Sequence, residues 1–178
     1  TLEDAINHRH LNLENIHFNT ADSHIIRTIE TALNDKNIYK QLFAIDLIKN
    51  LPLNKWRETL NNLLRHGKFE VQKQILILAS NRKKVLDKDI LLKLSGGIDE
   101  VAALAITLNS KKVLKNLSNK LLENLSHSNG HIKAASAVGL LRINKHDKGA
   151  RKILKDFLDV KDEESTALAL DYLKTSSD

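Results

Sequence analysis

Histidines are the residues whose spacing comes nearest to a metal-binding pattern in this chain. His127 and His131 are four residues apart, a spacing that would put both imidazoles on one face of a helix, where they could share a zinc ion. Gly130 interrupts a helix across that pair, and no carboxylate or further histidine stands at ligand spacing from it. Three more histidines lie near the beginning of the chain: His8, His10 and His17. Because no ligand set is complete, we predict no metal site.

Asp46 is the carboxylate that most resembles a catalytic acid, since it stands alone between Ile45 and Leu47. Excision of a base from DNA would need such a carboxylate beside an aromatic cleft, but aromatic residues make up only 4% of the chain. We expect Asp46 to lie at the surface or to cap a helix. No Ser-His-Asp set can be assembled from the spacing, and Gly96-Gly97 follows no strand, so it is a turn rather than a phosphate loop. The sequence therefore predicts a protein that is not an enzyme and holds no cofactor.

Basic residues form short clusters that recur along the chain. Stacked helical repeats would align them along one edge, and we call this set the predicted basic ridge: Lys49, Arg82, Lys83, Lys84, Lys111, Lys112, Lys115, Arg142, Lys145 and Lys174. Such a ridge fits an anionic partner, either lipid headgroups or nucleic-acid phosphate. Cations also stabilise helix C-termini by roughly 0.3–1 kcal/mol each without binding anything, and that explanation stays open. Nucleic acid is the weaker candidate partner, because scattered aromatics and few clustered arginines offer little for base stacking or base readout.

A repeated pair of helices is the element that would position these residues. Residues 56–66 place apolar side chains three and four apart, as on one face of a helix, and residues 68–80 make a second apolar stripe after the turn at Gly67. Trp56 is expected to pack at the start of its helix. Leucines equivalent to Leu64 recur every 30 to 33 residues: Leu33, Leu94, Leu125 and Leu158. Branched aliphatic residues stand four positions before each of these leucines: Ile29, Leu60, Ile90, Leu121 and Leu154.

Two further columns follow the same period. Apolar residues stand twelve positions after each leucine: Ile45, Leu76, Ile106, Ala137 and Leu170. The residues eleven positions after each leucine are Ala44, Ile75, Ala105, Ser136 and Ala169, and all of them except Ile75 are small. Only 42% of the residues are apolar, so two apolar columns that are each filled five times out of five are not expected by chance. A period between 20 and 50 residues is typical of a solenoid, whose repeats bury their faces by stacking.

The sequence thus predicts an all-α fold, an α-solenoid of about five antiparallel helix pairs. The pairs span residues 23–50, 54–80, 87–110, 111–143 and 147–174. In the first pair the helices are expected at 23–33 and 37–50, with a turn before Asn37, and in the fourth pair at 111–126 and 130–143. Asn54 is a suitable cap for the first helix of the second pair. Residues 1–22 do not match the repeat, and we expect a short helix and an extended linker that cap the first pair. A single proline and six glycines suit a nearly all-helical chain.

The column pattern over residues 23–174 resembles HEAT repeats, the two-helix units of right-handed, armadillo-like α-solenoids. HEAT units typically carry an arginine just after the aliphatic residue that opens the second helix. The corresponding residues here are Gln72, Ala102, Lys133 and Thr166. The usual ladder of ion pairs between repeats is therefore not expected, and packing must supply more of the stability.

A narrower resemblance covers the first eighty residues. It is carried by the segments at residues 2–13, 26–33, 43–48 and 56–66, which are similar to the HEAT domain attached to bacterial carriers related to the ATP/ADP translocases. This resemblance implies a soluble cytoplasmic domain that is tethered to the inner membrane as part of a larger protein. Its partner would be its own transporter domain, another protein or anionic lipid headgroups. The transport residues of those carriers lie in their membrane part, so the resemblance implies no site residue in this chain.

Composition sets the remaining bounds. The chain has no cysteine, so disulfides are excluded and a reducing, cytosolic location is permitted. No apolar run approaches the roughly 20 residues that span a bilayer, and no signal peptide is visible. Because Thr1 is not methionine, we expect an excised domain of a longer protein rather than a natural start. The alternative to a scaffold is a free-standing HEAT-like nucleic-acid-binding protein of the DNA glycosylase type.

Overall fold

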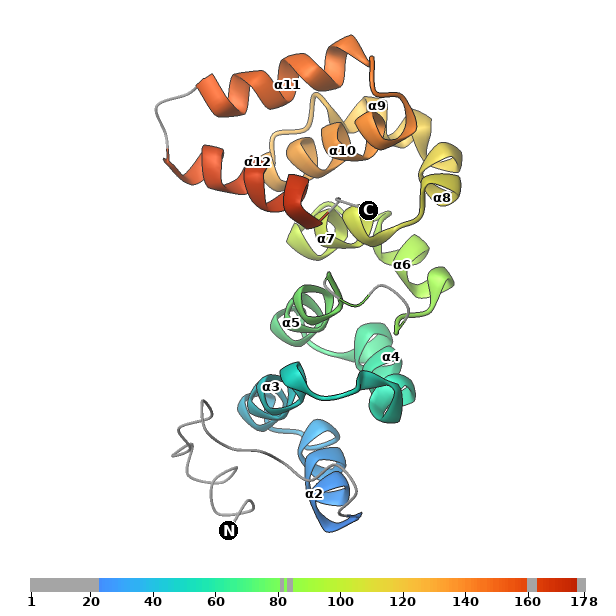
Figure 1. The fold of residues 1–178 in the computed structure, drawn as a ribbon, viewed down its shortest axis with the longest axis vertical. Helices are drawn as coiled ribbons and strands as arrows, with labels where there is room; N and C mark the ends of the chain where they lie inside the picture. The colour runs from blue at the N-terminus through green and yellow to red at the C-terminus, as the bar shows by residue number, and fades with distance from the viewer. Residues whose placement is uncertain (1–22, 81, 83–84, 160–162, 176–178) are drawn as a thin grey trace. The chain divides into compact units, whose positions relative to one another are not determined.

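The structure, a computed structural model, describes residues 23–80, 82, 85–159 and 163–175. Within these ranges the chain forms eleven α-helices and two short 3₁₀ helices and no strand, so the predicted all-α class is confirmed. The helices belong to two compact units, and Figure 1 shows their order along the chain. The first unit holds the described residues up to Leu78 together with Val85 and Leu86, and the second holds the rest. The predicted cap, residues 1–22, lies outside the described residues.

Four α-helices and two 3₁₀ helices make up the first unit. They are α2 (Ser23–Leu33), α3 (Ile38–Leu47), η2 (Ile48–Asn50), η3 (Leu53–Trp56), α4 (Arg57–His66) and α5 (Phe69–Ser80), whose last two residues fall in the second unit. α2 packs against α3, and the Asn37 side chain caps α3 by accepting a hydrogen bond from the Tyr39 N–H at 2.9 Å. α4 ends at Gly67, where a Cβ would overlap the Leu63 carbonyl oxygen, so this turn requires a glycine.

The core of the first unit consists of the columns that the period picked out. Ile29, Leu33, Leu60, Leu64, Ile75 and Leu76 are each at most 1% exposed. Trp56 is 1% exposed, which confirms the prediction that it packs at the start of its helix. The prediction that Asn54 caps this helix is wrong, because η3 already begins at Leu53 and Trp56 occupies the N-cap position of α4.

Seven helices make up the second unit, and α10 lies at its centre. They are α6 (Lys88–Leu94), α7 (Glu100–Leu108), α8 (Lys111–Asn116), α9 (Ser118–Asn124), α10 (Gly130–Ile143), α11 (Lys148–Asp159) and α12 (Glu163–Thr175). α10 packs against α7, α8, α9, α11 and α12, as its position beneath α11 in Figure 1 illustrates. Small side chains allow this close approach, since the residues at 134–137 and 139 are alanine, serine or glycine and all are buried.

The first helix of the fourth pair differs from the prediction. Residues 111–126 were expected to form one helix, but α8 ends at Asn116 and α9 begins at Ser118. Leu117 between them has φ −93° and ψ 3°, and its N–H is shared between the carbonyl oxygens of Val113 and Leu114 at 3.3 and 3.0 Å. Asparagine and serine on either side of Leu117 are weak helix formers, which favours a break at this point.

The periodic columns are also buried unequally. The aliphatic residues four positions before each of the leucines equivalent to Leu64 are at most 6% exposed in all five predicted pairs. Among these equivalent leucines, only Leu33 and Leu64 are fully buried, whereas Leu158 is 44% exposed. Leu170 is likewise 43% exposed. The helix boundaries follow the predicted pairs closely, while the arrangement of those pairs as a solenoid stays a prediction.

Candidate anion-binding surface

Positive charge is concentrated in one stretch of the second unit. The chain has 28 basic and 22 acidic residues and a formal net charge of +6. Residues 101–146, all of them described, contain one acid, Glu123, and seven basic residues: Lys111, Lys112, Lys115, Lys120, Lys133, Arg142 and Lys145. This stretch therefore accounts for the whole net charge, and the remaining residues hold 21 of each sign. A positive region of this kind attracts anionic partners over about a Debye length.

Three lysines of this stretch lie on α8. Lys111 and Lys112 are its first two residues and Lys115 lies in its last turn, and all three side chains are exposed. None of the three pairs with an acid among the residues that the structure describes. Lys111 and Lys112 stand at the start of α8, where a helix dipole disfavours cations, but they also follow the end of α7 by three and four residues, where a helix dipole favours them. Their positions agree with either role.

The outer side of α8 and α9 combines these lysines with an exposed leucine. Leu114 on α8 and Leu121 on α9 both lie against Gly139 of α10, with Cδ atoms 3.6 and 3.3 Å from the position of a Cβ there, so the two helices turn the same side to α10 despite the break. Lys111, Lys115 and Leu122 are four and seven residues apart, a spacing that puts them on one side of a helix. Leu122 is 49% exposed, while Leu114 and Leu121 on the inner side are fully buried. We call Lys111, Lys112, Lys115 and Leu122 the α8–α9 surface.

Arg142 contributes to this region mainly by holding it in place. One terminal nitrogen (Nη1) of Arg142 donates to the carbonyl oxygens of Thr107 and Asn109 at 2.8 and 3.0 Å. These carbonyls belong to the end of α7, where no helical N–H follows to bond them. Arg142 therefore ties α10 to the turn that leads into α8, whereas Lys145, beyond the end of α10, is exposed.

Buried side chains anchor the same turn from within. The Asn109 amide nitrogen donates to the Ser95 hydroxyl oxygen at 2.7 Å and to the Ala105 carbonyl oxygen at 2.9 Å. The Ser95 hydroxyl in turn donates to the Leu91 carbonyl oxygen at 2.7 Å. Asn109 is 2% exposed, so this network is shielded from water and links the ends of α6 and α7 directly below the first residue of α8.

The other members of the predicted basic ridge are spread over both units. Lys49 lies in η2 of the first unit and forms an ion pair with Asp46 at 2.9 Å, which confirms that Asp46 lies at the surface. Arg82 is half-buried in the second unit. Lys83 and Lys84 lie outside the described residues, as does the side chain of Lys174. The structure thus brings Lys111, Lys112 and Lys115 together on α8, and a continuous ridge stays a prediction.

Three features of this site were not predicted from the sequence. Leu122 was not considered as a surface residue, and Asn109 was not recognised as an anchor. Nor was the concentration of charge in residues 101–146 noticed, although counting acids and bases in successive windows of the sequence would have found it.

His127 and His131 in the second unit each contact a neighbouring polar group. The His127 Nδ1 accepts a hydrogen bond from the Asn129 N–H at 3.0 Å. The His131 Nδ1 lies 3.0 Å from the Tyr172 hydroxyl, with the two rings edge to face. Burial raises the pKa of Tyr172, and the negative charges of Glu100 and Asp171 raise it further. No group of three metal-ligand side chains occurs in the described part of the chain; the lack of a metal site stays a prediction.

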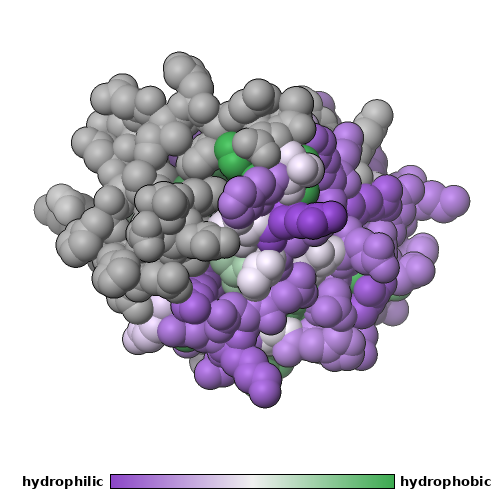
Figure 2. All heavy atoms as spheres, turned by 90° about the horizontal axis from the view of Figure 1, so that it is seen from below, coloured by the Kyte–Doolittle hydropathy of each residue, from purple (hydrophilic) through white to green (hydrophobic). Residues whose placement is uncertain are grey.

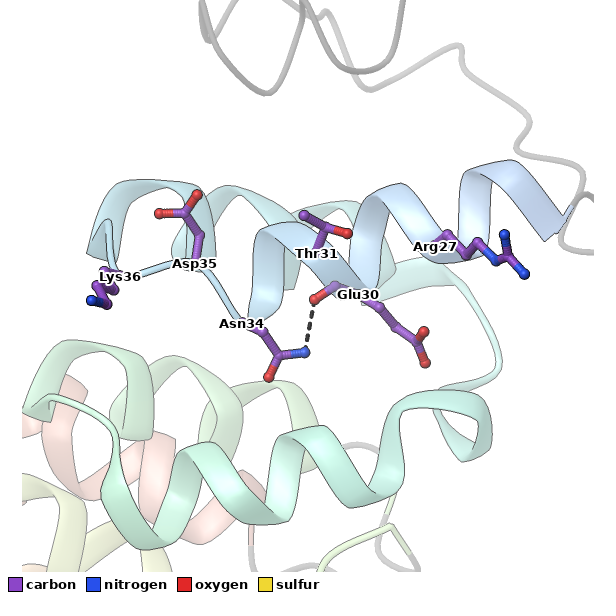
Figure 3. A pocket seen from close by; sticks show the side chains of 6 residues that line it. All are labelled: Arg27, Glu30, Thr31, Asn34, Asp35 and Lys36. Carbon is purple, nitrogen blue, oxygen red and sulfur yellow. Dashed lines mark hydrogen bonds between the residues drawn. The ribbon is translucent and has the colours of Figure 1, made fainter.

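A shallow pocket of about 730 Å³ lies in the first unit. Figure 3 shows its lining residues, which come from α2 and the turn after it: Arg27, Glu30, Thr31, Asn34, Asp35 and Lys36. Two cations and two anions cancel, and Asp35 forms an ion pair with Lys40 at 3.2 Å. The hydrogen bond from the Asn37 N–H lowers the pKa of Asp35, and the hydrogen bond from the Lys40 side chain lowers it further. The pocket offers neither a net charge nor an apolar cavity, so we assign it no ligand.

Figure 2 shows the hydropathy of the described residues on one face of the molecule. The described residues visible there are mostly hydrophilic, with small and separate hydrophobic areas. Large contiguous apolar patches would mark an interaction surface. Among the described helices, none is long and apolar enough to cross a membrane.

Comparisons with protein-family models, with curated proteins and with solved structures found no match to this chain.

Proposed function

We propose that this chain is a non-catalytic interaction module, a HEAT-like α-solenoid of about five helix pairs, whose basic stretch at residues 101–146 binds an anionic partner. The observation that carries the proposal is the concentration of the entire net charge of +6 in that stretch. Segregated charge of one sign costs self-repulsion, and an anionic partner would relieve it. No described cluster of side chains offers a competing catalytic arrangement.

We further propose that the module is the cytoplasmic domain of a membrane protein related to the ATP/ADP carriers, tethered to the inner membrane. The similarity of four segments within the first eighty residues supports this setting. In it the partner is the transporter domain itself, another protein or the anionic membrane surface next to it.

Chromatography on heparin, a flexible polyanion, tests the binding function. The variant Lys111→Glu/Lys112→Glu/Lys115→Glu removes the exposed lysines of α8. Its control, Lys68→Glu/Lys88→Glu/Lys152→Glu, reverses three exposed lysines outside residues 101–146 and brings the net charge from +6 to the same value of 0. We expect the α8 variant to elute at clearly lower salt than the control, because the positive potential is local.

Equal elution of the two variants would show that only net charge matters and would overturn the proposal. Circular dichroism of both variants establishes that they remain helical. Because Lys111 and Lys112 open a helix, glutamate at these positions suits the helix dipole, so the α8 variant should fold.

A nucleic-acid-binding protein of the glycosylase type is the second candidate, since the same positive stretch would fit phosphates. Residues 101–146 contain one arginine and no phenylalanine, tyrosine or tryptophan. The stretch therefore has no aromatic side chain to stack on bases and one guanidinium for bidentate contacts with base edges. Release of a modified base from duplex DNA by the purified chain would establish this candidate in place of the first.

A further inference from the structure

We propose that the α8–α9 surface docks on anionic lipid headgroups, with Leu122 entering the apolar boundary of the bilayer. The inference rests on the proposed function, because it names the partner of the same basic stretch. Four side chains carry it: Lys111, Lys112, Lys115 and Leu122.

The cations of this surface are all lysines. Each presents a compact ammonium on a flexible stem, which can reach headgroups of varied position without a fixed geometry. Because all three side chains are exposed and without an acidic partner among the described residues, docking breaks no ion pair within the described part of the chain. Each lysine near an anionic leaflet favours binding by about fivefold.

The exposed leucine distinguishes a lipid surface from nucleic acid. Leu122 lies on the same side as Lys111 and Lys115 and is 49% exposed, and the polar backbone of a duplex gains little from an exposed aliphatic side chain. At a bilayer surface, leucine can lie below the headgroups while lysines stay among them. Covering the exposed half of this side chain favours binding by about fivefold.

Glu123, the one acid in residues 101–146, does not oppose this orientation. It follows Leu122 directly and is exposed, so it projects about 100° away from Leu122 around the helix, on the side of Lys112, eleven residues before it. One carboxylate against three ammonium groups leaves the surface positive. Two anchors, the buried Asn109 and the half-buried Arg142, hold the start of α8 in place. The three lysines are therefore presented together without ordering a flexible loop on binding.

The small number of lysines limits how strongly this surface can bind a membrane. Three lysines at about fivefold each give on the order of a hundredfold preference for anionic over neutral bilayers. That is weak for a freely diffusing protein, since stable membrane binding generally takes two signals. It suits a domain that is already held at the membrane, where the effective concentration of headgroups is high.

Co-sedimentation of the full chain with vesicles tests the proposal. Vesicles of phosphatidylcholine alone are compared with vesicles that also contain phosphatidylserine, at low and at high salt. We expect binding to the anionic vesicles only, with loss of binding at high salt and in Lys111→Glu/Lys112→Glu/Lys115→Glu. Leu122→Gln should weaken binding about fivefold, whereas Leu92→Gln, at a leucine of α6 that is 42% exposed, should leave it unchanged.

Each of the other possible outcomes would reject a different part of the proposal. Binding to heparin without binding to anionic vesicles would reject the lipid partner and leave the proposed function standing. Tighter binding to duplex DNA than to anionic vesicles would reject the lipid partner in favour of nucleic acid. Equal effects of Leu122→Gln and Leu92→Gln would reject the insertion of Leu122. No binding to heparin or vesicles would reject this inference and the proposed function together.

Discussion

At the scale of single residues, Arg142 shows how a basic side chain can serve structure rather than binding. Its guanidinium donates to the carbonyl oxygens of Thr107 and Asn109, so it completes the hydrogen bonds of α7. Lys145, three residues later, is exposed and makes no such contact. Basic residues that are close in sequence can therefore differ in how much they contribute to the free energy of unfolding.

Replacement of Arg142 by alanine should lower the free energy of unfolding by about 1–3 kcal/mol, because both carbonyl groups lose their donor. Lys145→Ala is the control and should change it by less than about 0.5 kcal/mol, as is usual for exposed positions. Urea unfolding of both variants, followed by circular dichroism, measures the difference. Equal stability of the two variants would contradict the role assigned to Arg142.

At the scale of elements, α10 organises the second unit because its surface is made of small residues. A Cβ at Gly139 would lie 3.3 Å from Leu121 Cδ1 and 3.4 Å from Ile106 Cγ2, which leaves no room for a larger side chain. The neighbours α7 and α9 can approach α10 closely only for this reason. A column of small residues thus sets the spacing of the helices.

Gly139→Val should destabilise the chain by about 1–3 kcal/mol through overpacking against these two side chains. Gly149→Ala provides the contrast, because a Cβ at that position of α11 would meet its neighbours at ordinary distances of 3.5 Å. Removing that glycine from a helix should be neutral or stabilising by up to about 1 kcal/mol. Thermal unfolding of the two variants distinguishes these effects; a Gly139→Val variant as stable as the parent chain would show that α10 is not tightly packed there.

At the scale of the whole molecule, the distribution of charge matters more than its amount. A net charge of +6 over 178 residues is unremarkable, but 46 consecutive residues hold all of it. The rest of the chain carries balanced charges. An anionic partner is therefore expected to engage one region of the second unit rather than the chain as a whole.

The proposed membrane setting makes a prediction at this scale. A blot of fractionated source cells, with an antibody against this chain, should show a band well above 20.1 kDa in the membrane fraction. Salt washing should leave the band there, because a membrane-spanning part anchors far more strongly than surface charge. A soluble band near the mass of this chain would contradict the carrier-related setting and would favour a free-standing protein.

Most of the helices, and the burial of the aliphatic column four positions before each recurring leucine, could be predicted from the sequence alone. The apolar periods and the turns at Gly67 and Asn37 are local signals, and the helix boundaries agree with them. Residues such as Ile29, Leu60 and Leu121 are buried as their spacing predicts, because a helix with one apolar face must cover that face.

Only the tertiary structure decided which polar and exposed residues matter. Asn109 and Ser95 are fourteen residues apart, and Arg142 lies more than thirty residues from the carbonyls that it bonds, so no local pattern could reveal these contacts. The exposure of Leu122 likewise depends on how α9 packs on α10. Sequence spacing fixes the faces of each helix, but the partners of those faces depend on packing between segments distant in the chain.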